Sequence, residues 1–147
     1  MFTGITQETL DTVGRFTLLW NVFERNFYNQ RCGEPKIING NDLNISNETM
    51  QKCNELKEYF LTNGGAASSI IGRLHFRNND LRLIVFDWFD NNNFSSKAVV
   101  GVIYRIRCNA FHGNKTAFII QGQVEMFECI NEILICILQS NNLSLAD

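Results

Sequence analysis

The near absence of proline constrains the fold of this chain more than any other feature of its sequence. Pro35 is the only proline among 147 residues, and it lies in a polar segment. Proline breaks helices from within, so a chain almost free of it can form long uninterrupted helices. Apolar residues recur every three or four positions, whereas the strict alternation that marks strands is weak. The sequence therefore predicts a mainly helical protein.

Six segments carry this helical spacing, and residues that favour helix termini mark several of their ends. Thr6 and Ser46 are expected N-caps, and Gly64 with Gly65 is expected to end the second helix. The apolar segment 81–89 fits a buried strand as well as a helix, and we favour a helix because its neighbours are helical. We expect helices over residues 7–31, 47–61, 67–76, 81–89, 97–111 and 117–140.

The apolar faces of these helices predict the core, and the first helix carries a stripe of large aromatic side chains on one face. The expected core residues of the first two helices are Leu10, Val13, Phe16, Leu19, Trp20, Phe23, Phe27, Met50, Cys53, Leu56, Tyr59 and Phe60. Long first, fifth and last helices with short connections predict an all-α fold, an irregular helical bundle of about five to six helices. The length fits one domain, spanning residues 1–147.

The composition excludes several classes of protein. A formal net charge of -2 gives no bulk attraction for polyanions, so a nucleic-acid contact needs a local basic patch. Five cysteines without a Cys-x-x-Cys pair argue against a disulfide framework and a structural zinc site, and two histidines are too few for a multi-histidine site. The N-terminus lacks a signal-peptide pattern, and the longest apolar run, residues 133–138, is too short for a membrane span. We expect a cytoplasmic protein without metal, cofactor or membrane association.

A basic segment near the end of the fifth expected helix carries the residues that point to chemistry. His112 lies at this helix end and is followed directly by Gly113. No Asp or Glu occurs in residues 95–124, whereas the rest of the chain carries nine basic and fifteen acidic residues. A basic zone on an acidic protein fits a phosphate-bearing partner that is held locally. The basic residues of this zone are Lys97, Arg105, Arg107 and Lys115.

Arg107, His112 and Gly113 resemble the Arg-x(4–6)-His signature of the HEPN domain family, in the Apea-like form Arg-Asn-Asn-apolar-Phe-His-Gly. The order of helices is also similar, with a long aromatic first helix and the motif near the end of the penultimate long helix. The resemblance covers most of the chain as a pattern, although its specific part is the short motif itself. It implies an HEPN-like helical domain, a metal-independent endoribonuclease activity and a homodimer that brings two motifs together.

Cys108 departs from the family pattern, because active relatives usually carry a polar residue, often Asn, directly after the arginine. Asn109 matches the second Asn of the common form, and Arg107 and His112 are intact. The departure removes a supporting hydrogen-bonding group and motivates an alternative, a catalytically silent HEPN-like module that binds RNA, a nucleotide or a protein. Cys108 and His112 are also four residues apart on one helix face, so a thiol–imidazole pair is a further alternative.

The chemistry of RNA cleavage without a metal suits these residue types. A proton must leave a 2′-hydroxyl, the departing 5′-oxygen must gain one, and charge on the phosphorane must be stabilised. Histidine titrates near neutral pH and can transfer the protons, whereas arginine stays charged and offers planar paired donors to phosphate oxygens. We therefore expect Arg107 and His112 to be catalytic, with RNA as substrate and no cofactor.

Helix geometry separates the two expected catalytic residues and suggests others beside them. Five steps of about 100° place Arg107 and His112 roughly 140° apart, so they converge only if the helix unwinds near Gly113 or the arginine bends around it. Arg105, seven residues before His112, is nearly in line with it, and Asn109 shares that face. We expect Arg105, Asn109 and Lys115 to contact the substrate.

Ordinary structural roles compete with these assignments. A histidine at a helix end is favoured by the helix dipole, and Arg107 can form an ion pair with Glu24 or with the last helix. His75, flanked by two arginines, suggests a second basic site, but we favour a solvated helical face there. The leading functional hypothesis is a ribonuclease of a toxin–antitoxin or antiphage defence system, with an antitoxin or regulatory protein as a possible partner. A purely structural helical interaction protein is the third hypothesis.

Overall fold

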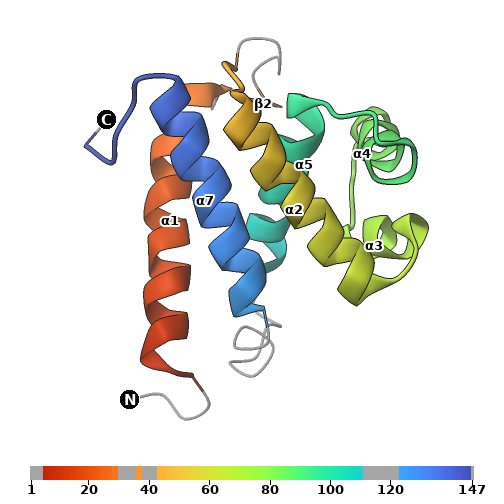
Figure 1. Ribbon diagram of the computed structural model, residues 1–147, viewed down its shortest axis with the longest axis horizontal. Coiled ribbons are helices and arrows are strands. Elements are labelled where there is room, and N and C mark those ends of the chain that lie inside the picture. The colour runs from red at the N-terminus through yellow and green to blue at the C-terminus, as the bar shows by residue number, and fades with distance from the viewer. Residues whose placement is uncertain (1–4, 30–35, 38–42, 111–122, 147) are drawn as a thin grey trace.

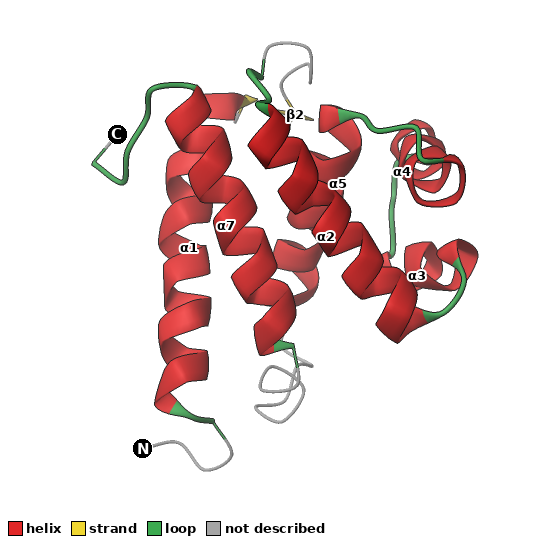
Figure 2. Ribbon diagram, in the orientation of Figure 1, coloured by secondary structure: helices red, strands yellow, loops and turns green. Residues whose placement is uncertain are grey.

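The structure is a computed structural model, and it describes residues 5–29, 36–37, 43–110 and 123–146. Helices dominate this part of the chain (Figure 2), which confirms the prediction of an all-α bundle with five to six helices. The segment 81–89 is helical, as predicted. The helices are α1 (Gln7–Phe27), α2 (Asn47–Gly64), α3 (Ala67–Leu74), α4 (Asn79–Asn91), α5 (Ser96–Ala110) and α7 (Val124–Ser140).

Several of the predicted helix ends differ from the structure, and α2 continues to Gly64, three residues beyond the expected residue 61. The first expected helix extends to residue 31, but α1 ends at Phe27 and is followed by β1 (Tyr28–Asn29), which pairs antiparallel with β2 (Lys36–Ile37). Tyrosine favours strands and asparagine is a poor helix former, so this short pairing replaces the last helical turn. The third expected helix extends to Phe76, but α3 ends at Leu74 because His75 adopts a left-handed backbone with a φ of 57°.

Side-chain caps and a left-handed glycine set the helix ends that the sequence predicts correctly. The Thr6 hydroxyl accepts a hydrogen bond from the backbone N–H of Thr9 at 3.2 Å, and the Ser46 hydroxyl accepts one from Thr49 at 3.1 Å. Gly65 ends α2 with a φ of 83°, a conformation that costs glycine little. The two hydroxyls pair terminal N–H groups that a helix cannot satisfy by itself.

The helices α1, α7 and α2 lie side by side, α5 lies behind them, and α3 and α4 form one end of the molecule (Figure 1). Helices α1 and α7 run in the same direction, and α2 runs against them. The rings of Phe16 on α1 and Phe127 on α7 lie 5.3 Å apart, and both side chains are fully buried. At the far end of α7, Asn141 accepts a hydrogen bond from the Asn44 backbone N–H at 3.2 Å, which connects α7 to the start of α2.

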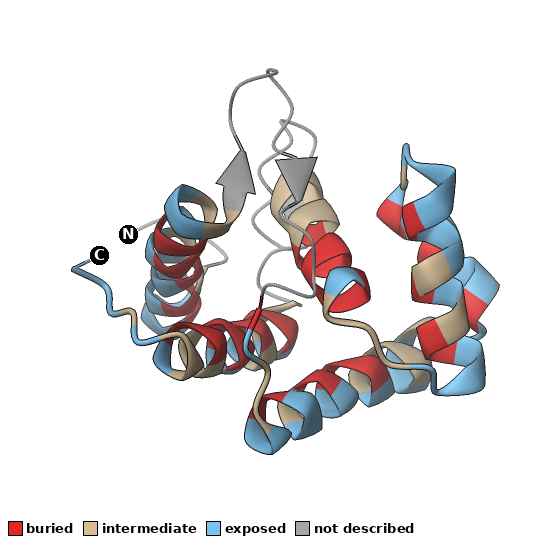
Figure 3. Cartoon of the chain, turned by 90° about the horizontal axis from the view of Figure 1, so that it is seen from above, coloured by how far each residue is buried: buried red, intermediate tan, exposed pale blue. Residues whose placement is uncertain are grey.

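The core lies on the inner faces of these helices (Figure 3) and follows most of the predicted apolar positions. Helix α5 is buried on all sides from Ala98 to Ile103, as expected for a helix at the centre of a bundle. Leu10 and Met50 are predicted core residues, yet each is 37% exposed. Leu10 lies nine helical steps, about 180°, from the buried Leu19 and so faces away from the core. Within the described ranges, no helix combines the length and apolar character that a membrane span requires.

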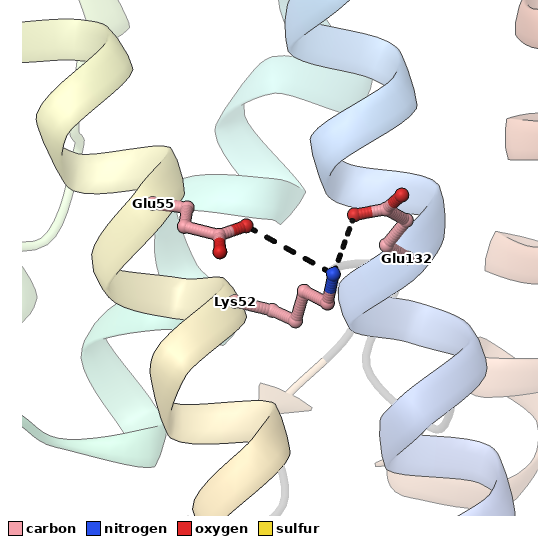
Figure 4. A network of polar contacts seen from close by, with 3 residues as sticks. All are labelled: Lys52, Glu55 and Glu132. Carbon is pink, nitrogen blue, oxygen red and sulfur yellow. Dashed lines mark ion pairs between the residues drawn. The ribbon is translucent and has the colours of Figure 1, made fainter.

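Cations from one helix contact another helix in several places. On the surface, the Lys52 ammonium on α2 lies 3.2 Å from the Glu132 carboxylate on α7 and 4.0 Å from Glu55 (Figure 4), an exposed network that stabilises little. The buried Lys57 of α2 donates to the side-chain oxygen of Asn92, the residue that caps the C-terminal end of α4. Such ends carry a partial negative charge, so a cation is favoured there.

Candidate functional site

The predicted site residues lie where α5 leaves the core. The helix is buried from Ala98 to Ile103, and from Tyr104 to Asn109 its side chains are half-buried except at Ile106. The reason is visible in the sequence, which changes from an apolar run to alternating basic, apolar and polar residues. Arg105, Arg107 and Asn109 are therefore held by the buried part of a rigid helix and reach solvent at its end.

Arg105 and Asn109 converge on a single backbone carbonyl. The Nε of Arg105 donates to the carbonyl oxygen of Leu74 at 3.0 Å, and Nδ2 of Asn109 donates to the same oxygen at 3.2 Å. Leu74 is the last residue of α3, where carbonyl groups have no donor within the helix. The two predicted substrate contacts thus have a structural role, in which they cap α3. The guanidinium of Arg105 keeps further N–H donors besides Nε.

Arg107 lies on a different side of α5. Two helical steps place it about 200° from Arg105, whereas three steps place it on the same side as Tyr104. The Tyr104 ring stacks on Trp20 of α1 with centroids 6.2 Å apart, so this side of α5 faces α1. The structure gives Arg107 no hydrogen bond or ion pair with another described residue, and Glu24, its expected alternative partner, forms none with it.

Three of the motif's residues lie outside the described part of the chain. They are His112, Gly113 and Lys115, and the predicted approach of His112 to Arg107 lies outside it as well. The structure therefore brings together Arg105 and Asn109, separates Arg107 from them, and leaves the pairing with the histidine as a prediction.

The cysteines differ in their surroundings. Burial raises the pKa of the Cys53 thiol to about 12, and burial also raises the pKa of Cys129 and of Cys136. A thiol must lose its proton to act as a nucleophile, so these three are poorly suited to covalent chemistry. Cys129 and Cys136 are half-buried, and Cys129 packs against the core. Cys108, the residue that departs from the motif, is half-buried on the last turns of α5.

A second basic element lies next to the first. His75 is exposed and lies at the C-cap of α3, beyond the helix and not on a helical face as predicted. It directly follows Leu74, whose carbonyl binds Arg105 and Asn109. The neighbouring Arg73 is exposed, and its Nη2 donates to the carbonyl of Gly64 at the end of α2. The sequence shows these basic residues but does not indicate that they meet the motif.

Elsewhere in the described part of the chain, the structure shows no metal-binding cluster, and it shows a hollow away from α5. Among the described residues, no group of three or more histidine, cysteine, aspartate or glutamate side chains is arranged to hold a metal ion. A hollow of about 280 Å³ lies on the outer side of α1 against the C-terminal segment, lined by Leu18, Asn21, Val22, Arg25 and Leu145. No predicted site residue lines this hollow.

The chain was compared with protein families, curated proteins and solved structures, and no match was found. The resemblance to HEPN domains therefore depends on the motif at the end of α5 and on the order of the helices.

Proposed function

We propose that this protein is a metal-independent endoribonuclease in which Arg107 and His112 are the catalytic residues. The observation that carries the proposal is the state of Arg107. It lies on the last turn of a helix anchored in the core, it is half-buried, and no described side chain or carbonyl uses its charge. A guanidinium that is held on a core helix and pairs with no described residue is suited to bind a phosphate.

In the proposed reaction, the substrate supplies its own nucleophile. The 2′-hydroxyl oxygen of one nucleotide loses its proton and attacks the adjacent phosphorus, while the bond to the 5′-oxygen of the next nucleotide breaks. The products are a cyclic phosphate and a 5′-hydroxyl. A histidine such as His112 can accept or donate these protons, and Arg107 stabilises the charge on the phosphorane oxygens.

The site is proposed to be completed by a second copy of the chain, as in the family that the motif resembles. A homodimer brings two Arg107–His112 motifs together, so one histidine can act as base while the other acts as acid. Regulation by an antitoxin or another protein within a defence system belongs to the same proposal.

RNA cleavage in the presence of EDTA tests the proposal directly. The purified protein is expected to cut a single-stranded RNA, and His112→Ala and Arg107→Met are expected to lose this activity while remaining folded. Arg25→Met removes an exposed arginine on α1 and is the matched control. Cleavage that persists in His112→Ala would exclude the assignment.

Cys108 favours a second candidate function, an HEPN-like module that binds RNA, a nucleotide or a protein without cutting. Cys108 is half-buried at the position where active relatives carry a polar residue. Cys108→Asn restores that group, so it is expected to raise the cleavage rate if the protein is a weakened enzyme. If the parent and Cys108→Asn proteins both bind RNA and neither cuts it, the binding module is the correct assignment.

A further inference from the structure

Two acid-free segments of the chain, distant in sequence, carry the basic residues that concern this inference. The first, residues 59–79, contains Arg73, His75 and Arg77 but no Asp or Glu. The second, residues 95–124, contains the motif on α5. On a chain with more acidic than basic residues, such segments are places where positive charge is concentrated along the sequence.

The fold joins these two segments directly. Arg105 and Asn109 of the second segment both donate to the carbonyl of Leu74 in the first, across 31 and 35 residues of sequence. The connection from α3 to α4 therefore begins beside the last turns of α5 (Figure 1). The basic residues of this connection lie next to the last turns of α5, on the side that carries Arg105 and Asn109.

The connection carries exposed basic side chains. Arg73, His75 and Arg77 are all exposed, and His75 is held in a left-handed conformation with a φ of 57° at the end of α3. Arg73 uses one N–H of its guanidinium to bind the Gly64 carbonyl, so its position is set by the fold. Asp80, the first acidic residue along the chain after this connection, lies on the first turn of α4.

We propose that this turn, defined by Arg73, His75 and Arg77, binds the phosphate backbone of the RNA that the α5 site cuts. The inference rests on the proposed function, and it extends the substrate contact from the last turns of α5 to a second element. Phosphates follow one another along a strand, so the turn can hold one stretch of the RNA on the Arg105 side of α5 while Arg107 contacts another stretch from a different side of the same helix end. Arginine side chains bind phosphate oxygens with paired donors, and because the α5 site is proposed to cut RNA, the expected partner is RNA and not an acidic protein surface.

Binding of a labelled RNA as a function of salt concentration tests this inference. The probe is a fluorescein-labelled single-stranded RNA, and its anisotropy is followed with His112→Ala protein so that the RNA stays intact. The test variant is His75→Asn with Arg77→Gln, because asparagine tolerates the left-handed backbone at position 75. The matched control is Arg15→Gln with Arg25→Gln, which removes two exposed cations from α1.

The test variant is expected to raise the Kd for RNA roughly tenfold, and to reduce the slope of log Kd against log salt by about 0.7 for each phosphate that the protein no longer binds. The control is expected to match the parent in both. If the double variant melts at a lower temperature than its parent, Arg77→Gln alone replaces it, with a reduction in slope of about 0.7.

Failure of the inference and failure of the proposed function give different results. Cleavage by the unmodified protein, together with equal RNA affinity of the test variant, its control and the parent, overturns this inference alone. If RNA binding depends on Arg77 but the protein does not cut RNA, the result supports RNA binding by the turn and excludes the proposed nuclease activity. A parent protein that neither cuts nor binds RNA, or that binds anionic lipid vesicles through Arg77 instead, overturns both.

Discussion

Arg105 and Arg107 lie two residues apart on the same helix, and their substitution should have opposite consequences. Arg105→Met is expected to lower the stability of the fold, because its Nε binds the carbonyl at the end of α3. Arg107→Met is expected to leave stability nearly unchanged and to abolish RNA cleavage. The comparison separates an arginine that holds the structure from one that acts on substrate.

The magnitudes follow from the hydrogen bonds at the Leu74 carbonyl. A hydrogen bond to a charged group contributes about 1.5–3 kcal/mol, and half-burial places Arg105 near the lower value. The neutral bond from Asn109 contributes about 1 kcal/mol, so Asn109→Leu should cost about that much. Because both bonds end on one carbonyl, the double variant leaves it without either side-chain donor and should lose about 2.5 kcal/mol or more. Arg107→Met should stay within about 0.5 kcal/mol of the parent.

Urea unfolding followed by circular dichroism measures these differences, provided that the slope of free energy against urea is the same in all variants. In thermal melts, the double variant should unfold about 5–10 °C below the parent, since about 1 kcal/mol corresponds to about 2–4 °C in a chain of this size. The reasoning is refuted if Arg105→Met and Arg107→Met cost the same, or if the double variant unfolds at the midpoint of the parent.

Two further substitutions test the packing and the electrostatics of the fold. A Cβ at Gly101 in α5 would lie 2.7 Å from Leu81, so Gly101→Ala should lower the free energy of unfolding by about 1–3 kcal/mol. Gly14 has open space around it, so Gly14→Ala should raise the free energy of unfolding by about 0.5–1 kcal/mol. Urea midpoints distinguish the two signs. Burial, followed by the charge of Glu8, raises the pKa of Glu128, so ionised Glu128 destabilises the fold as pH rises through that pKa. Glu128→Gln should therefore raise the urea midpoint at pH 7 and have little effect at pH 4, and an equal effect at both values would contradict this cause.

Helix positions could be predicted from the sequence where a short local signal determines them. Ser46 and Gly65 act within one turn of the helix ends that they set, so neighbouring residues suffice to recognise them. Periodicity alone leaves segment 81–89 open between helix and strand, and the side chain of Asn78 favours the helix by accepting from the backbone N–H of Leu81 at 3.1 Å. Asn78 is one residue before the helix, so this signal is also local.

The contacts of the candidate site could not be predicted in the same way. Periodicity gives the face on which Arg105 and Asn109 lie, but the carbonyl that they bind belongs to a helix more than thirty residues earlier. From the sequence, Arg105 and Arg107 are equivalent basic residues. Their different roles follow from the fold, in which α3 and α1 lie on different sides of α5. Leu10 shows a different limit: it lies nine helical steps, about 180°, from the buried Leu19, so the predicted core face of α1 is too wide at this position.

The cations of α2, α3 and α5 each bind the C-terminal end of a different helix, and this arrangement has a consequence for dynamics. An eight-residue helix such as α3 is too short to be stable alone. It therefore depends on two hydrogen bonds to its neighbours, from its own Arg73 to the Gly64 carbonyl of α2 and from Arg105 of α5 to its Leu74 carbonyl. Local unfolding of α3 must therefore break contacts to α2 and α5 together, which makes these helices a cooperative unit. In amide hydrogen exchange, the backbone amides of α3 should exchange as slowly as those of α2 and α5. When Arg73 or Arg105 is substituted, the amides of α3 should lose protection before those of the other helices.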